Sequence, residues 1–124
     1  MIGAVDRTFL LVGALAGFIA VALGAFGAHG LRGRLTPEML AVFETGVRYH
    51  MYHALAIIAT ALVMGRGAGR LATAAGWLFT AGIVLFSGSL YALALSGITV
   101  LGAITPIGGL AFLLGWACLA FAVI

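Results

Sequence analysis

Residues 71–124 read "LATAAGWLFTAGIVLFSGSLYALALSGITVLGAITPIGGLAFLLGWACLAFAVI" and contain no aspartate, glutamate, lysine or arginine. A helix needs roughly twenty apolar residues to cross the hydrocarbon core of a bilayer. This stretch is too long for one such helix, and it fits two. The break is expected between Ser96 and Thr105, where glycine mixes with β-branched residues, and Thr105 with Pro106 is typical of a helix start. The stretch therefore predicts two transmembrane helices, over about 71–95 and 105–124.

The rest of the chain is almost as poor in charge. Its 124 residues include six arginines, no lysine and three acids, whereas charged residues make up about a quarter of a typical globular chain. A soluble domain could not cover its exterior with so few charges. The composition predicts one all-α domain over 1–124, a polytopic bundle of four transmembrane helices whose partner is membrane lipid. Nothing in this charge supply argues for nucleic-acid binding.

The first half of the chain supplies two further spans. The first is predicted over about 8–28, and the second ends near Met64, before the glycine-rich turn "GRGAGR" (65–70). Thr36, Pro37 and Glu38 form a strong helix start. A helix from there to Met64 would be about 42 Å long, more than the hydrocarbon core requires. We therefore expect a bend near Gly46, with an interfacial amphipathic helix over about 37–46 and the span itself over 47–64.

The arginines indicate an orientation. Four spans place both chain ends on one side of the membrane, together with Arg7, Arg66 and Arg70, while Arg32 and Arg34 lie on the other side, with Arg48 at the membrane edge there. Because cytoplasmic loops are enriched in basic residues, both termini are predicted to face the cytoplasm from the inner (plasma) membrane.

Small residues recur every three or four positions along the first span. Such a face favours close packing of helices in lipid, and its members are Gly13, Gly17, Ala20, Gly24 and Gly27.

Residues 43–56, "FETGVRYHMYHALA", concentrate the polar groups of the chain. At 100° per residue, His50 and His53 share one helix face with Tyr49. Glu44 and Arg48 lie on the opposite face with Tyr52, in the favourable order for an ion pair. The first span ends with "GAFGAHGLRGR" (24–34), so His29 is expected to emerge on the side where the second helix enters the membrane. The candidate ligand-binding residues are His29, Arg48, Tyr49, His50, Tyr52 and His53.

Three interpretations of this cluster compete. The side chains could simply pin the first connection at the interface through hydrogen bonds. They could hold a lipid headgroup, a quinone or a small anion, or pass protons. They could also bind a metal or a b-type haem through His29, His50 and His53, with Glu44 as a further metal ligand.

No nucleophile motif and no phosphate loop is present, so no catalytic residue is predicted, and the lone Cys118 lies in an apolar run. We expect a non-enzymatic protein, either a lipid- or ligand-binding protein or an accessory subunit, which associates as a homo-oligomer or within a larger membrane complex. A metal- or haem-dependent redox component and a small transporter or channel acting as an oligomer are the alternatives.

Four stretches in order carry a resemblance to a known family: "LGAFGAHGL" (23–31), "FETGVRYHMYHALA" (43–56), "FSGSLYALALSG" (86–97) and "ITPIGGLAFLLGW" (104–116). The chain resembles the domain of unknown function 423 family, whose eukaryotic relatives are called transmembrane protein 256-like. The resemblance implies a four-helix inner-membrane protein and supplies no catalytic assignment.

Overall fold

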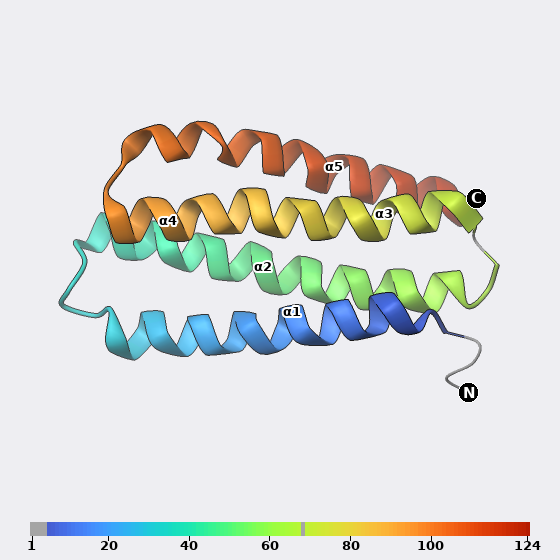
Figure 1. Ribbon diagram of the computed structural model, residues 1–124, viewed down its shortest axis with the longest axis horizontal. Coiled ribbons are helices and arrows are strands. Elements are labelled where there is room, and N and C mark those ends of the chain that lie inside the picture. The colour runs from blue at the N-terminus through green and yellow to red at the C-terminus, as the bar shows by residue number, and fades with distance from the viewer. Residues whose placement is uncertain (1–4, 68) are drawn as a thin grey trace.

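The computed structural model describes residues 5–67 and 69–124. It contains four long helices, and each runs antiparallel to the next one along the chain (Figure 1). The first consists of α1 (Arg7–Ala25) and a π-helical turn, η2 (Phe26–Gly30), and the second is α2 (Pro37–Met64). The third joins α3 (Gly69–Gly82), a second π-helical turn, η3 (Ile83–Ser87), and α4 (Gly88–Ser96). A short 3-10 helix, η4 (Thr99–Ala103), leads into α5 (Thr105–Ala122). Each of the four is long and apolar enough to span a membrane.

The second helix holds the bundle together. α2 packs against α1 on one side and against α3, η3 and α4 on the other, and α5 covers α3 and η3. The start of α1 and the end of α5, and with them the described ends of the chain, lie at the same end of the bundle (Figure 1). The opposite end of the bundle is formed by the connection between α1 and α2 and by the connection before α5.

α2 starts where the sequence predicts but does not break where it predicts. Thr36 is the N-cap, its Oγ1 accepts a hydrogen bond from the Met39 amide at 3.2 Å, and Pro37 opens the first turn. The helix then continues to Met64 without interruption at Gly46, so residues 37–46 and 47–64 belong to one helix. Gly46 serves packing instead, because a Cβ there would lie 2.8 Å from Cε1 of Tyr91.

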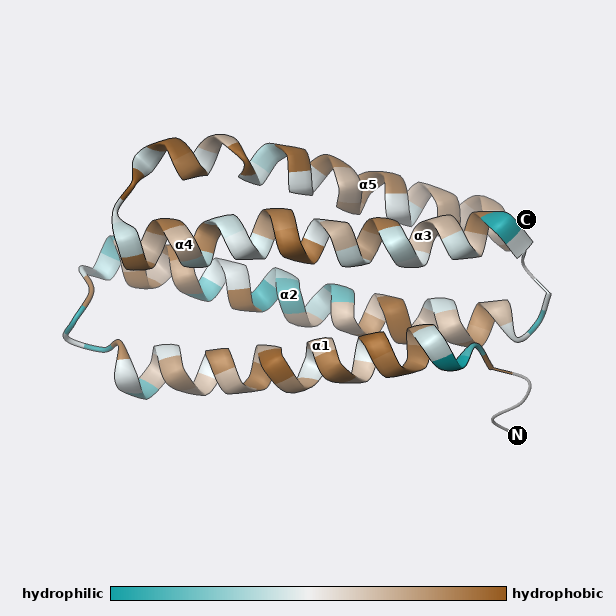
Figure 2. Cartoon of the chain, in the orientation of Figure 1, coloured by the Kyte–Doolittle hydropathy of each residue, from teal (hydrophilic) through white to brown (hydrophobic). Residues whose placement is uncertain are grey.

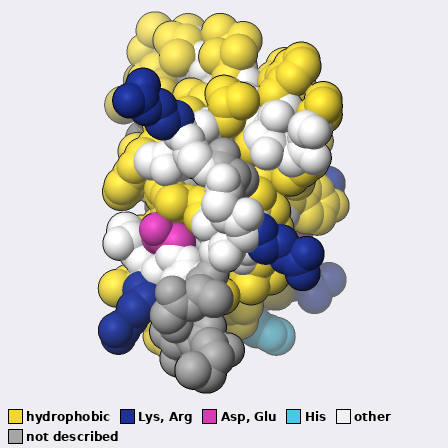
Figure 3. Space-filling view, turned by 90° about the vertical axis from the view of Figure 1, so that its right-hand side faces the viewer, with side chains coloured by type: hydrophobic (Ala, Val, Ile, Leu, Met, Phe, Trp, Pro, Cys, Tyr) yellow, Lys and Arg dark blue, Asp and Glu magenta, His cyan; other side chains and the backbone are white. Residues whose placement is uncertain are grey.

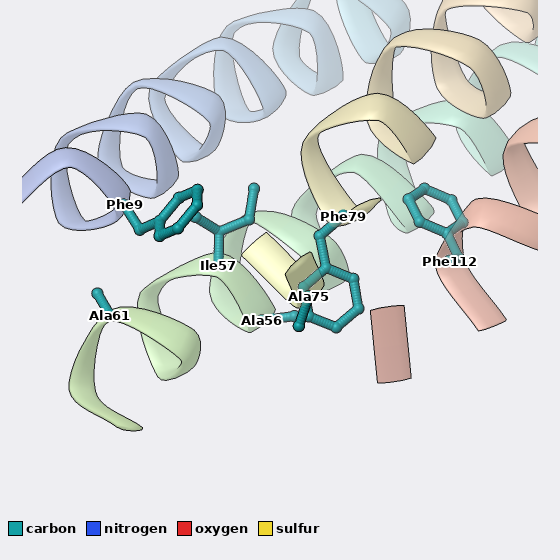
Figure 4. Packing of buried hydrophobic residues seen from close by; sticks show 7 residues of the cluster. All are labelled: Phe9, Ala56, Ile57, Ala61, Ala75, Phe79 and Phe112. Carbon is teal, nitrogen blue, oxygen red and sulfur yellow. The ribbon is translucent and has the colours of Figure 1, made fainter. Parts of the chain in front are cut away.

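The small residues of α1 pack as predicted. A Cβ on Gly13 would meet Cγ1 of Ile58 at 2.6 Å, and one on Gly27 would meet the ring of Phe43 at 2.9 Å. α1 and α2 therefore approach closely along the glycine face. Nearer the end that holds the termini, the buried core brings together all four long helices through Phe9, Ile57, Phe79 and Phe112 (Figure 4).

The start of α5 differs from the prediction. Thr105 does not cap the helix: the N-cap position is Ile104, without a capping side chain. The Thr105 hydroxyl instead lies 2.6 Å from the Ser89 hydroxyl and joins α5 to α4. In a surrounding without water, pairing two hydroxyls across helices satisfies both groups.

Polar residues are distributed unevenly over the bundle. Figure 3 looks onto the end that holds the chain termini and shows basic side chains spread around its rim; Arg7, Arg66 and Arg70 are exposed in the segments at this end. Most residues of α1 and α5 are hydrophobic, whereas hydrophilic residues occupy the middle of α2 (Figure 2). This polar middle of α2 is the feature that calls for a functional explanation.

Candidate site in the middle of the bundle

His50 and His53 are both buried in α2, at 5% and 4% exposure. They lie 13 and 16 residues after Pro37, which corresponds to about 20 and 24 Å along a helix that rises 1.5 Å per residue. The prediction that they sit at the membrane surface assumed a span that begins at residue 47. Because α2 is continuous from Pro37, they lie near the middle of the bundle instead.

His53 is fully engaged by the protein. The indole N–H of Trp116 donates to His53 Nε2 at 3.1 Å, and since an indole can only donate, this nitrogen accepts. The ring hydrogen therefore lies on Nδ1, which donates to the Tyr49 carbonyl oxygen at 2.6 Å. The imidazole also stacks on Phe112 with ring centroids 3.5 Å apart and planes 7° from parallel. Neither nitrogen has a lone pair left for a metal or a ligand, so His53 connects α2 to α5 structurally.

His50 faces a different neighbour. Its Nδ1 lies 2.8 Å from the hydroxyl of Tyr91 on α4. Two features position this phenol: the Phe43 ring packs against it with centroids 4.9 Å apart, and Gly46 leaves room for its edge. One turn before Tyr91, Ser87 is buried and donates to the Gly46 carbonyl oxygen at 2.7 Å, which ties the π-helical turn η3 to α2. The pair of His50 and Tyr91 is thus held from both helices.

A groove of about 490 Å³ opens over this pair, between α1 and the third long helix. Its walls are apolar and include Leu15 and Ile19 from α1 and Ile83 and Val84 from η3. His50 and Tyr91 line it, and so does Gly88, where an added Cβ would meet nothing within 4 Å. Among the described residues that line the groove, none carries a full charge. We call this the His50 groove.

The other candidate residues are elsewhere. His29 is exposed in η2 at the end of the first helix, and Arg48 is exposed on α2. Tyr49 and Tyr52 are exposed and pack edge to face at 5.6 Å. With His53 and Trp116 they line a second apolar groove of about 370 Å³ between α2 and α5. The structure therefore separates the six candidates into four places.

The candidate metal ligands do not come together in one place. In the part of the chain that the structure describes, no three His, Cys, Asp or Glu side chains come together in a way that could hold a metal. The set of His29, His50 and His53 is therefore not assembled. Glu44 and Arg48 are both exposed on α2, and an exposed ion pair of this kind would contribute little to stability.

Three functional contacts could not be seen in the polar stretch itself. Tyr91 and Ser87 come from "FSGSLYALALSG", where a phenol in an apolar span is the available signal. Trp116 lies 63 positions after His53, and its indole N–H donates to that imidazole.

Comparison with known proteins places the chain among membrane proteins. A family model described as "Protein of unknown function (DUF423)" matches residues 23–109. The UPF0382 membrane protein YwdK of Bacillus subtilis is 50% identical over 120 residues, 95% of this chain and 97% of that protein. A UPF0382 membrane protein of Staphylococcus haemolyticus is 49% identical over 113 residues, 91% and 92% of the two chains. No solved structure matches the chain.

Proposed function

The chain belongs to the DUF423 family, whose relatives are named membrane proteins, and we propose that it binds an uncharged, lipid-soluble small molecule in the His50 groove. The observation that carries this proposal is a hydrogen-bonded imidazole and phenol at the floor of an apolar groove in the middle of a membrane bundle. Polar groups at this depth are costly and mark functional sites by default.

The shape and the lining of the groove support a ligand of this kind. Its volume lies within the usual 300–1,000 Å³ of small-molecule sites, which combine apolar walls with a few placed polar groups. The apolar walls favour a ligand that reaches the groove from the lipid. A phosphate or carboxylate headgroup would meet no arginine among the described lining residues, so the ligand is expected to be neutral.

This proposal narrows the predicted site. His50 remains a ligand-binding residue and Tyr91 joins it. His29, Arg48, Tyr49 and Tyr52 are assigned to the bundle surface, where they would contact lipid headgroups, lipid chains or another protein. His53 is assigned to the contact between α2 and α5.

The same proposal includes a location and an orientation. We place the protein in the inner (plasma) membrane with both termini in the cytoplasm. The support is the three arginines at the end with the start of α1, Arg7, Arg66 and Arg70, against Arg32 and Arg34 in the connection at the other end, with Arg48 within α2, following the preference of basic residues for the cytoplasmic side. A homo-oligomer or a larger membrane complex remains the expected assembly.

Filling the groove tests the proposal. In Gly88→Leu the new side chain enters the groove without meeting the protein's own atoms at its Cβ. The purified protein in mild detergent is incubated with a total membrane lipid extract, and bound molecules are counted by native mass spectrometry. We expect a retained neutral molecule in the wild type and at least a fivefold smaller bound fraction in the variant.

Controls make the result specific. Ala117→Leu adds a similar bulk on an exposed position of α5 and is expected to retain binding. Val84→Trp fills the same groove from a position that is 66% exposed, and it replaces Gly88→Leu if that variant does not fold. Equal binding by the wild type and a folded groove variant, or no binding by the wild type, overturns the proposal.

A further inference from the structure

One face of α2 is exposed along nearly the whole length of the helix. At roughly 100° per residue, eight side chains fall within a narrow stripe, of which seven are exposed and Ala59 is half-buried. His50 points almost directly away from the middle of this stripe, so the His50 groove lies on the other side of α2. We call this face the α2 stripe, and its members are Pro37, Ala41, Glu44, Arg48, Tyr52, Leu55, Ala59 and Leu62.

Arg48 of the α2 stripe lies inside the hydrocarbon core of the membrane. It precedes Met64 by 16 residues, which corresponds to about 24 Å along the helix. The exposed Arg66 follows Met64 closely, and arginine is costly within the core, so the Met64 end of α2 lies at the edge of the core or beyond it. With a core of roughly 30 Å, Arg48 is then about 6 Å or more inside the opposite edge.

The exposure of Arg48 and Glu44 is unusual for charged groups at this depth. Charged side chains within transmembrane segments almost always face the interior of a bundle or a water-filled cavity. Both residues are instead exposed on the outside of this bundle, and Tyr52 is exposed one turn further along the same face. Such a face is poorly suited to hydrocarbon chains. It therefore indicates that a second protein surface covers the α2 stripe.

Its two charges make the α2 stripe complementary to a copy of itself. Glu44 and Arg48 are four residues apart, about 6 Å along the helix axis, and they carry opposite charges. In a twofold pair, residue i of one copy contacts residue j of the other, and j contacts i. Two parallel α2 helices can therefore place Glu44 of each copy beside Arg48 of the other, since the long arginine side chain can span an offset of one turn.

The other members of the α2 stripe suit the same pairing. They follow one another at intervals of three or four positions, the spacing with which two helices pack side by side. Ala41 and Ala59 allow the two backbones to approach closely. Leu55 and Leu62 are exposed and would pack across the interface. Pairing would thus bury apolar and charged members of the stripe together.

We propose that the α2 stripe joins two copies of this chain in a parallel homodimer, in which Glu44 of each copy forms an ion pair with Arg48 of the other. This inference goes beyond ligand binding and names the surface through which the expected homo-oligomer forms. A buried ion pair contributes to the choice and register of the partner more than to affinity, and the packed alanine and leucine side chains supply the remaining contact. In the dimer both His50 grooves stay open to lipid.

Exchanging charges between copies tests the pairing. Two differently tagged copies are co-expressed, extracted in mild detergent and purified through one tag, and the recovered fraction of the other copy is measured. When both copies carry Glu44→Arg, or both carry Arg48→Glu, the facing charges are alike, and recovery should fall roughly fivefold or more. When one copy carries Glu44→Arg and the other Arg48→Glu, the facing charges are again opposite, and recovery should return to within about twofold of the wild type.

The mixed pair also controls for folding, because it contains both substitutions. Glu38→Arg is the matched control for charge: it makes the same replacement at an exposed position of α2 that lies off the stripe, and it should leave recovery unchanged. Two results overturn the proposal. One is recovery of the like-charged pairs at the level of the wild type, and the other is a mixed pair that recovers no better than they do.

A second measurement uses no charged substitution. In a Cys118→Ser background, Leu55→Cys places a thiol in the middle of the stripe, where equal positions of the two copies lie near the twofold axis. Oxidation with copper phenanthroline in isolated membranes should then join two copies by a disulfide. Val84→Cys is the control, because Val84 is 66% exposed but lines the His50 groove; its dimer yield should be roughly tenfold lower, since a disulfide needs Cα atoms within about 7 Å.

The outcomes of cross-linking separate this proposal from the proposed ligand site. No dimer from Leu55→Cys, or an equal yield from Val84→Cys, overturns the pairing. A cross-linked product of another mass also overturns it and shows that a different protein covers the stripe. Each of these results leaves the ligand proposal standing, because Gly88→Leu alters the groove on the other side of α2. If Gly88→Leu binds ligand as the wild type does while Leu55→Cys cross-links, the proposed function alone fails.

Discussion

His50 and His53 are three positions apart in α2, yet their surroundings give them different roles. His53 has both ring nitrogens bonded and is stacked on Phe112. His50 is hydrogen-bonded to the phenol of Tyr91, and both residues line a groove. Three residues on a helix correspond to a rotation of 300°, or 60° in the opposite sense. In the centre of a bundle that rotation is enough to direct neighbouring side chains to different helices.

At the same scale, removing the indole N–H should destabilise the protein. Trp116→Phe leaves His53 Nε2 without a donor in a setting that excludes water, which costs about 1–3 kcal/mol for a buried unsatisfied group. Trp77→Phe is the control, because Trp77 is similarly exposed and packs on Phe9 through its ring, edge to face at 4.9 Å. Reversible unfolding in mixed micelles would measure both variants. Equal losses of stability would argue that the His53 contact contributes nothing.

At the scale of whole helices, the sequence predicts well which segments form helices and in which order they cross the bundle. It predicts poorly how each helix is rotated about its own axis relative to its neighbours. Apolar length identifies the four spans, and Thr36 with Pro37 marks the start of α2, as the structure confirms. At Gly46, where a bend was expected, α2 has no break, and the missing Cβ accommodates Tyr91 from α4, a contact that local sequence does not reveal. The partners of His50 and His53 depend in the same way on how α4 and α5 are turned toward α2. A hydropathy pattern that is apolar all round cannot specify that rotation.

Two glycines, Gly88 at the start of α4 and Gly108 in α5, should change the stability of the protein in opposite directions when replaced by alanine. A Cβ on Gly108 would collide with the backbone of Phe86 in η3, and backbone cannot rotate away, so α5 must shift at a cost of about 1–3 kcal/mol. Gly88 has a helical φ of −59° and free space around its Cβ position. Gly88→Ala should therefore gain about 0.5–1 kcal/mol through a less flexible unfolded chain. Unfolding measurements on both variants check the contrast; destabilisation by Gly88→Ala would mean that the groove is closed in the membrane.

In the whole molecule, charged and uncharged polar groups occupy different places. The charged groups lie toward the ends of the bundle and on the outer face of α2, whereas the uncharged pair of His50 and Tyr91 lies inside. α2 is about 42 Å long at 1.5 Å per residue, more than the roughly 30 Å of a hydrocarbon core. Its first turns, with Glu38 exposed, must therefore project beyond the core or tilt within it.

The orientation of this molecule can be tested with single cysteines in intact cells. In a Cys118→Ser background, Glu38→Cys places a thiol at the exposed start of α2, and Val123→Cys places one at the exposed end of α5. These two replacements leave all six arginines in place, and acids contribute little to orientation, so the variants should keep the native topology. With both termini in the cytoplasm, a membrane-impermeant thiol reagent should label residue 38 in intact cells and residue 123 only after permeabilisation. The reverse pattern would show that three arginines against two are too few to set the orientation, and labelling of both in intact cells would mean that copies insert in both directions.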